Sequence, residues 1–275
     1  MKSLLTLSAL GAIAYFGLTR FERNMIWPLD PMQASPREIG IAANEHYRTM
    51  RDGTEIIVWT KAPNAGQPII FYLHGNAGNL MARSWRYNWF VGNGYGLVAM
   101  SYRGSSGSEG KASERKILSD AQEIWGQISS LTVNHGSPVV IYGESIGGAV
   151  GTGLATKLQD DPRLAGLVLE APFTSIPEII RQSLPQFRTL TFALKNRFPT
   201  QDRIATITTP LLVMHGTHDQ VIPFDMGQSV FAAATSPNKT FIEIPGGGHD
   251  NTWQPFVMER LDQFLSDAQV SGSGN

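Results

Sequence analysis

Short apolar runs, separated by longer amphipathic or glycine-rich segments, recur through the central and C-terminal parts of the chain. Such runs predict buried strands, and the amphipathic segments between them predict helices. Strands that alternate with helices favour a mostly parallel sheet covered on both faces. The predicted strands are 55–59, an early antiparallel strand, followed by 68–73, 96–101, 138–142, 167–169, 210–216 and 240–245. The main predicted helices are 112–125, 149–158 and 254–268.

The segment from Gly143 to Gly148 reads Gly-Glu-Ser-Ile-Gly-Gly and lies between a predicted strand and a predicted helix. This order is typical of a nucleophile elbow, a tight turn that lifts a serine hydroxyl clear of the sheet. Glycine at 143 and 147 removes side chains that would collide in the turn, and Gly148 lets the helix start close to the strand. A chance match is the alternative, since 28 of the 275 residues are glycine. Ser145 is the candidate nucleophile.

A nucleophilic serine needs a base, and the base needs an acid that orients it. With this type of elbow, the acid and then the base follow the serine along the chain. Asp219 lies in a loop just after strand 210–216, and His249 lies in a glycine-rich loop just after strand 240–245. Sheets of this class place their sites at the carboxyl ends of strands. The sequence therefore predicts a triad of Ser145, His249 and Asp219.

Other assignments of these residues stay open. Glu170, at the end of strand 167–169, is the main rival for the acid, and Asp250 and Asp202 are weaker rivals. Taken alone, Asp219 could be an ordinary turn aspartate and His249 a histidine that hydrogen-bonds a loop. Their order and their positions after strands favour the triad.

Acyl transfer also places negative charge on the carbonyl oxygen, which backbone N–H groups must stabilise. One donor should be Ile146, the residue after the nucleophile. The other should come from loop 74–79, after strand 68–73, and Asn76 is assigned as this second oxyanion-hole donor. A plain turn would suit the same glycine and asparagine content. His74 is expected to brace this loop.

Several stretches also carry a family resemblance: His74-Gly75-Asn76-Ala77-Gly78-Asn79, Ser101-Tyr102-Arg103-Gly104, Gly143-Glu144-Ser145-Ile146-Gly147-Gly148, Glu170-Ala171-Pro172-Phe173-Thr174-Ser175 and Gly248-His249-Asp250. They resemble the α/β-hydrolase superfamily and, within it, the membrane-anchored, Bem-like group of serine hydrolases. The resemblance implies the α/β-hydrolase fold, with a mostly parallel central sheet flanked by helices and a short helical cap. It also implies the same triad. It says little about the substrate, because this fold hosts many chemistries.

The predicted hydrolase domain covers residues 25–270, with an insertion at about 173–204 in which apolar and basic residues alternate. One interpretation of the insertion is a pair of amphipathic helices packed on the core. The other is a small cap over Ser145 that lines an acyl pocket or faces a lipid surface. Residues 271–275 are expected to form a flexible tail.

Residues 3–18 carry no charge, with Lys2 before them and Arg20 after them. This pattern predicts a signal anchor or a signal peptide within residues 1–24. Tyr15 and Phe16, near the end of the stretch, favour an uncleaved anchor. We therefore expect a protein anchored in a membrane by a single N-terminal helix, with export after signal-peptide cleavage as the alternative.

Composition excludes some functions. A net charge of −1 gives no indication of nucleic-acid binding. The absence of cysteine excludes disulfides, thiolate metal sites and lipid-modified cysteines. The triad chemistry needs no metal or cofactor.

The predicted function is that of a serine hydrolase that cleaves carboxylic ester or thioester bonds through an acyl-enzyme intermediate. Its substrate would be a small-molecule or lipid acyl compound, drawn from a membrane if the anchor is retained. The alternatives are a non-catalytic, membrane-tethered interaction protein with the same fold, and a peptidase or acyltransferase with the same triad. The pattern predicts neither the natural substrate nor the oligomeric state.

Overall fold

The computed structural model describes residue 17 and residues 19–272 of the chain. The stretch predicted as a signal anchor or signal peptide therefore lies almost wholly outside the described residues, and so do residues 273–275 of the predicted tail. Among the described helices, none is both long and apolar enough to cross a membrane.

In the described part of the chain, eight strands form one sheet in the order β1-β2-β4-β3-β5-β6-β7-β8. The pairs β1·β2 and β2·β4 are antiparallel, and all later neighbours in this order are parallel. The strands are β1 (Asn44–Thr49), β2 (Glu55–Lys61), β3 (Ile69–Leu73), β4 (Gly96–Met100), β5 (Val139–Glu144), β6 (Leu164–Glu170), β7 (Leu211–Gly216) and β8 (Lys239–Ile244).

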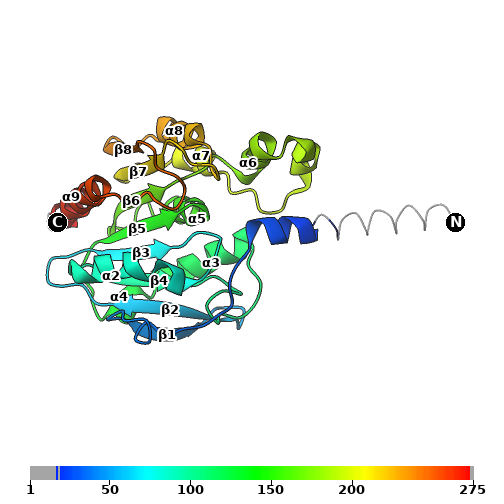
Figure 1. Cartoon of the computed structure of the whole chain (residues 1–275). Coiled ribbons are helices and arrows are strands. Elements are labelled where there is room, and N and C mark those ends of the chain that lie inside the picture. Colours follow the sequence, from blue (N-terminus) through cyan, green and yellow to red (C-terminus); the bar gives the residue numbers. More distant parts are fainter. Residues whose placement is uncertain (1–16, 18, 273–275) are drawn as a thin grey trace.

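Helices cover both faces of this sheet (Figure 1). They are α2 (Ser84–Gly92), α3 (Glu114–Trp125), α4 (Ile128–Thr132), α5 (Ile146–Ala155), α6 (Ile176–Ser183), α7 (Thr200–Ile204), α8 (Phe224–Ala233) and α9 (Pro255–Gly272). Alternate side chains of a strand point to opposite faces. Phe71 of β3 accordingly lies in one core with residues of α3, α5 and α8, whereas Tyr72 lies in a second core with residues of α2 and α9. β3, β5 and β7, in the interior of the parallel part of the sheet, are buried at every position. The predicted fold class is confirmed.

The segment predicted as a cap leaves the sheet after β6 and contains α6, a 3-10 helical stretch (Pro185–Ala193) and α7. Ser175 caps α6 by accepting a hydrogen bond from the amide of Glu178. Residues 19–26 form a helix that lies beside this cap (Figure 1). The rings of Phe21 and Phe187 join the two, with centroids 5.1 Å apart. The helix at 19–26 is thus packed against the cap.

Candidate active site

Ser145 lies at the turn between β5 and α5, in a backbone conformation that non-glycine residues rarely adopt. Its φ is 53° and its ψ is −116°, and the side chain is almost buried. Its amide donates to the carbonyl oxygen of Glu170 at 2.8 Å, which ties the turn to the end of β6. These features match the strained turn expected of a nucleophile elbow.

Two of the three glycines around Ser145 are needed for this turn. A Cβ atom at Gly147 would lie 1.9 Å from the carbonyl oxygen of Leu73, and one at Gly143 would lie 2.5 Å from that of Gly147. A Cβ atom at Gly148 would find its nearest neighbour at 3.4 Å, an ordinary contact. The prediction that position 148 must be glycine for the helix to start close to the strand is therefore wrong. The predicted collisions at positions 143 and 147 agree with the structure.

Asp219 and His249 lie in the loops after β7 and β8 and face each other. His249 Nδ1 is 2.7 Å from Asp219 Oδ2. The other carboxylate oxygen of Asp219 accepts hydrogen bonds from the amides of Val221 and Ile222, each at 2.8 Å. Because the Asp219 side chain is fully buried and bound on both oxygens, its orientation is fixed.

The two groups shift each other's pKa. Burial alone would lower the pKa of His249 and raise that of Asp219. The hydrogen bond to Asp219 and its opposite charge outweigh burial at His249, so the pKa of His249 is raised. The hydrogen bonds from His215 and His249, with the charge of His249, outweigh burial at Asp219, so the pKa of Asp219 lies well below its usual range. A second histidine, His215, lies 3.4 Å from the carboxylate and adds to the lowering at Asp219. Asp219 is thus held ionised, and His249 is a stronger base than a free histidine.

The hydrogen bonds between described residues do not include one from Ser145 to His249. In unliganded sites such contacts are often long and become short only when substrate binds. The structure therefore brings the predicted acid and base together, while the contact between base and nucleophile stays a prediction.

The two predicted oxyanion donors line the same pocket as Ser145. Ile146 is the first residue of α5, so its amide has no acceptor within the helix. Asn76 lies in the loop after β3, and its side-chain Nδ2 donates to the carbonyl oxygen of Ile26 at 3.1 Å. This contact fixes the side chain of Asn76 and leaves its backbone amide as the group for the pocket.

The pocket has a volume of about 180 Å³ and a mostly apolar lining. Two of its walls come from the cap and from the loop after Asp219, as an acyl pocket would require. A further wall, from residues 25 and 26, was not foreseen from the sequence. The apolar lining residues are Met25, Ile26, Phe173, Ile176, Ile179, Ile180, Leu184, Val221 and Ile222.

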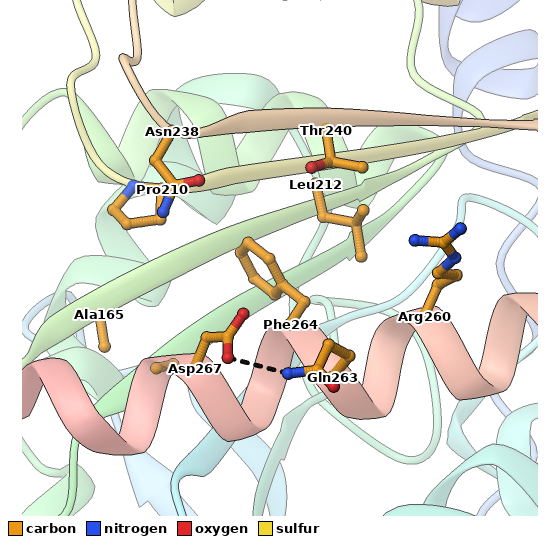
Figure 2. Close-up of a pocket in the computed structure, with 10 residues that line it drawn as sticks. Ala165, Pro210, Leu212, Asn238, Thr240, Arg260, Gln263, Phe264 and Asp267 are labelled. Atoms are coloured by element: carbon orange, nitrogen blue, oxygen red, sulfur yellow. Dashed lines mark hydrogen bonds between the residues drawn. The ribbon is translucent and has the colours of Figure 1, made fainter.

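A second hollow, of about 260 Å³, lies far from these residues, between α9 and the beginnings of β7 and β8 (Figure 2). Leu212 and Thr240 face it from the strands, and Phe264 and Arg260 face it from the helix. Asp219 and His249 follow the opposite ends of the same strands, so this hollow has no part in the candidate site. Among the described residues, no group of three or more acidic or histidine side chains is arranged to hold a metal ion.

The rival acids are placed elsewhere. Glu170 is fully buried and binds Arg86 through both carboxylate oxygens, at 2.8 and 2.9 Å. Asp202, in α7, and Asp250 are exposed. Of the candidate acids, Asp219 is therefore the one bound to His249.

Glu170 and Arg86 belong to a buried ion cluster next to the elbow, which was not predicted from the sequence. Arg86 also donates to Glu144, the residue before Ser145, at 2.9 Å, and Arg83 donates to the same carboxylate at 2.6 Å. The pKa of Glu144 is lowered to about 2 because these two cations outweigh the effect of burial. The signal in the sequence was the place of Glu144 inside the elbow motif, which indicates that its carboxylate needs buried partners.

His74 braces the loop after β3, as expected. It is fully buried, its ring stacks on that of Tyr102 at 4.0 Å, and its Nδ1 lies 2.7 Å from the carbonyl oxygen of Gly75. Burial and the charge of Arg83 lower its pKa to about 3. A histidine held neutral in this way suits a structural role.

The sheet order, the elbow and the loops after β7 and β8 define the α/β-hydrolase fold. Solved structures with this fold match most of the chain. An esterase of Pyrococcus furiosus matches with a TM-score of 0.69 at 18% identity, over 87% of this chain and 97% of that one. A soluble variant of the monoglyceride lipase of Saccharomyces cerevisiae matches with a TM-score of 0.65 at 14% identity, over 89% and 100%. At these identities the likeness shows the fold alone.

The sequence model of the hydrolase family described as serine aminopeptidase, S33, matches residues 65–200 and 178–253, and the chain belongs to this family. The chain is 30% identical to the alpha/beta hydrolase domain-containing protein WAV2 of Arabidopsis thaliana over 236 residues, which cover 80% of this chain and 76% of that protein. It is also 30% identical to the human alpha/beta hydrolase domain-containing protein 17B over 215 residues, 76% of this chain and 70% of that one.

Proposed function

We propose that the protein is a serine hydrolase that cleaves carboxylic ester or thioester bonds through an acyl-enzyme intermediate. The observation that carries the proposal is the position of Ser145, in a strained turn that lines an apolar pocket together with Asn76 and Ile146. The hydrogen bond between Asp219 and His249 supports it, because this is the pair that a catalytic serine requires.

In this mechanism His249 Nε2 takes the proton of Ser145 as the serine Oγ attacks the acyl carbonyl carbon. The amides of Ile146 and Asn76 donate hydrogen bonds to the oxyanion. His249 then gives its proton to the departing alcohol or thiol, and the acyl group stays on Ser145. Water, activated by His249, releases the acid. Asp219 holds the imidazole in the required tautomer and stabilises its charged form.

The substrate side of the proposal is an apolar acyl chain, taken from a small molecule or a lipid. The apolar lining of the pocket supports this choice. The uncharged stretch at residues 3–18 supports a membrane anchor, and with it a place in the membrane-anchored, Bem-like group. If the stretch is instead cleaved, the enzyme would be exported, and the chemistry at Ser145 would be unchanged.

Labelling by a fluorophosphonate probe tests the proposal, because the probe reacts much faster with an activated serine than with an ordinary one. Wild type and an exposed control, Ser119→Ala, should be labelled, whereas Ser145→Ala should not. Hydrolysis of an ester and thioester panel should fall by roughly 10⁴–10⁶-fold in Ser145→Ala with the fold intact. Near-native hydrolysis by this variant would overturn the assignment.

No labelling of a folded wild type would favour a non-catalytic, membrane-tethered interaction protein. The description of the family also makes a peptidase a candidate, so the panel includes aminoacyl amides. Faster turnover of the amides than of the esters would replace esterase by peptidase. Transfer of the acyl group to an added alcohol in preference to water would indicate an acyltransferase.

A further inference from the structure

The helix formed by residues 19–26 is built into the candidate active site. Met25 and Ile26 line the same pocket as Ser145 and the side chains that α6 contributes. We propose, on the basis of the function proposed above, that this helix selects the length of the acyl chain. In this proposal Met25 is the residue that determines specificity, and Glu22 is a positioning residue that holds the helix in place.

The end of the helix is fixed to the predicted oxyanion loop. The carbonyl oxygen of Ile26 accepts the hydrogen bond from the side chain of Asn76 at 3.1 Å, and Ile26 itself is buried. The next residue, Trp27, packs its ring edgewise on those of Tyr102 and Phe198, with centroids 6.4 and 6.0 Å away. A displacement of the helix would therefore move Asn76 as well as change the shape of the pocket.

The beginning of the helix is fixed to the cap by a buried carboxylate. One oxygen of Glu22, whose side chain is 2% exposed, accepts three hydrogen bonds. The donors are the amide of Lys195 at 2.9 Å and the amide and side-chain Nδ2 of Asn196, both at 2.7 Å. Hydrogen bonds to an ionised acceptor are stronger than neutral ones. Glu22 thus fastens the helix to the segment that follows α6, and the two walls of the pocket are held as one unit.

Between these walls, the side chain of Met25 is partly buried and unbranched. Such a side chain fills space without a rigid shape, so its size sets how much of the pocket is free. Removing its outer atoms should admit a longer acyl chain, and enlarging it should exclude chains that now fit. Each additional methylene that becomes buried should improve kcat/KM by about fourfold.

The test uses the full chain and p-nitrophenyl esters from acetate to palmitate. Met25→Ala should move the optimum to longer chains, and Met25→Phe should move it to shorter chains. Asn24→Ala is the matched control, since Asn24 lies on the same helix and is exposed. Its optimum should equal that of wild type. If Met25→Phe fails to fold, Met25→Ala and Met25→Leu carry the test.

A second pair of variants tests the fastening of the helix. Glu22→Gln removes the charge at constant size, and the exposed neighbour Arg23→Gln serves as its control. We expect Glu22→Gln to lose about tenfold in the ratio of kcat/KM for the preferred ester to that for acetate, on the order of one lost charge-assisted hydrogen bond. A general loss of stability would lower both values and leave the ratio unchanged.

An unchanged chain-length optimum in Met25→Ala, with Ser145 still labelled by fluorophosphonate, would overturn this inference and leave the proposed function standing. An unchanged ratio in Glu22→Gln would overturn the role of Glu22. Failure of folded wild type to label would instead overturn the proposed function, and the selectivity role with it.

Discussion

Replacement of Arg86 by methionine would show what the buried ion cluster contributes to stability. Arg86 binds both oxygens of Glu170, at 2.8 and 2.9 Å, and Glu170 is fully buried. In the described part of the chain, the other donors to Glu170, the side chains of Tyr142, Thr252 and Trp253, carry no charge. Methionine keeps most of the volume of the arginine stem but leaves this carboxylate without a cation.

The expected cost follows from that uncompensated charge. Removing one partner of a buried ion pair typically costs about 3–5 kcal/mol. Glu144, the second carboxylate bound by Arg86, keeps Arg83 at 2.6 Å and should add little. For a chain of this size, about 2–4 °C is lost per kcal/mol, so the melting temperature should fall by roughly 6–20 °C.

The assay is denaturant unfolding of wild type, Arg86→Met, Glu170→Gln and the double variant at neutral pH. Because the double variant removes both charges of the Arg86–Glu170 pair and leaves neither uncompensated, it should be more stable than the sum of the two single losses predicts. The control is Arg181→Met, which breaks an exposed pair with Glu178 and should cost at most about 1 kcal/mol. A loss in Arg86→Met as small as that of the control, or strict additivity in the double variant, would refute the reasoning.

The proposed catalytic residues and the elbow allow further predictions. Asp219→Asn should lower kcat by about 10³–10⁴-fold, because His249 loses the group that orients it; steady-state ester hydrolysis would show this, and a loss below tenfold would contradict it. Since Asp219 raises the pKa of His249, kcat/KM should fall as the pH drops through an apparent pKa above the ordinary 6.5, and a lower value in the pH–rate profile would contradict the pairing. Gly147→Ala should abolish folded, labelled protein, because its Cβ would meet Leu73, whereas Gly148→Ala should give a near-native yield and melting temperature.

The sequence predicted the parallel core of the sheet because strands buried on both faces are continuous apolar runs. β3 and β7 are buried at every position and lie within the predicted 68–73 and 210–216. β1 was missed because it lies at the edge of the sheet and its side chains are exposed or only partly buried, so no apolar run marks it. α2 was missed because it buries Arg86, a residue that a pattern of apolar positions assigns to the surface.

The candidate site also contains residues that the sequence could predict and residues that it could not. Ser145, Asp219 and His249 could be named because a local motif and a fixed chain order point to them. The ion cluster and the pocket wall formed by the helix at 19–26 could not be predicted, because the residues that contact each other there are distant in the sequence. Arg86 and Glu170 are 84 residues apart, and Glu22 and Asn196 are 174 residues apart. Such contacts depend on the finished fold, and composition gives no sign of them.

The ion cluster joins the loops that carry the proposed catalytic residues. Arg83 donates to the backbone of the oxyanion loop and to Glu144, next to the nucleophile. Arg86 links Glu144 to Glu170, and Glu170 accepts the hydroxyl of Thr252, three residues after His249. A single, largely buried network therefore joins the predicted oxyanion loop, the elbow and the loop of His249.

The helix at 19–26 and the cap line the pocket of Ser145. In the described part of the chain, the carboxylates of Glu144 and Glu170 make their hydrogen bonds with other elements. The effects of the ion cluster and of the wall formed by the helix and the cap should then be distinguishable by kinetics. Weakening the ion cluster should lower kcat/KM for all esters by a similar factor, because it displaces groups that every reaction uses. Weakening the wall should change the ranking of the esters, because it alters the space for the acyl chain. Any displacement of Asn76 through Ile26 should affect all esters alike and leave the ranking unchanged. A site built in this way can change its substrate through the helix and the cap while the geometry of Ser145 and His249 is preserved.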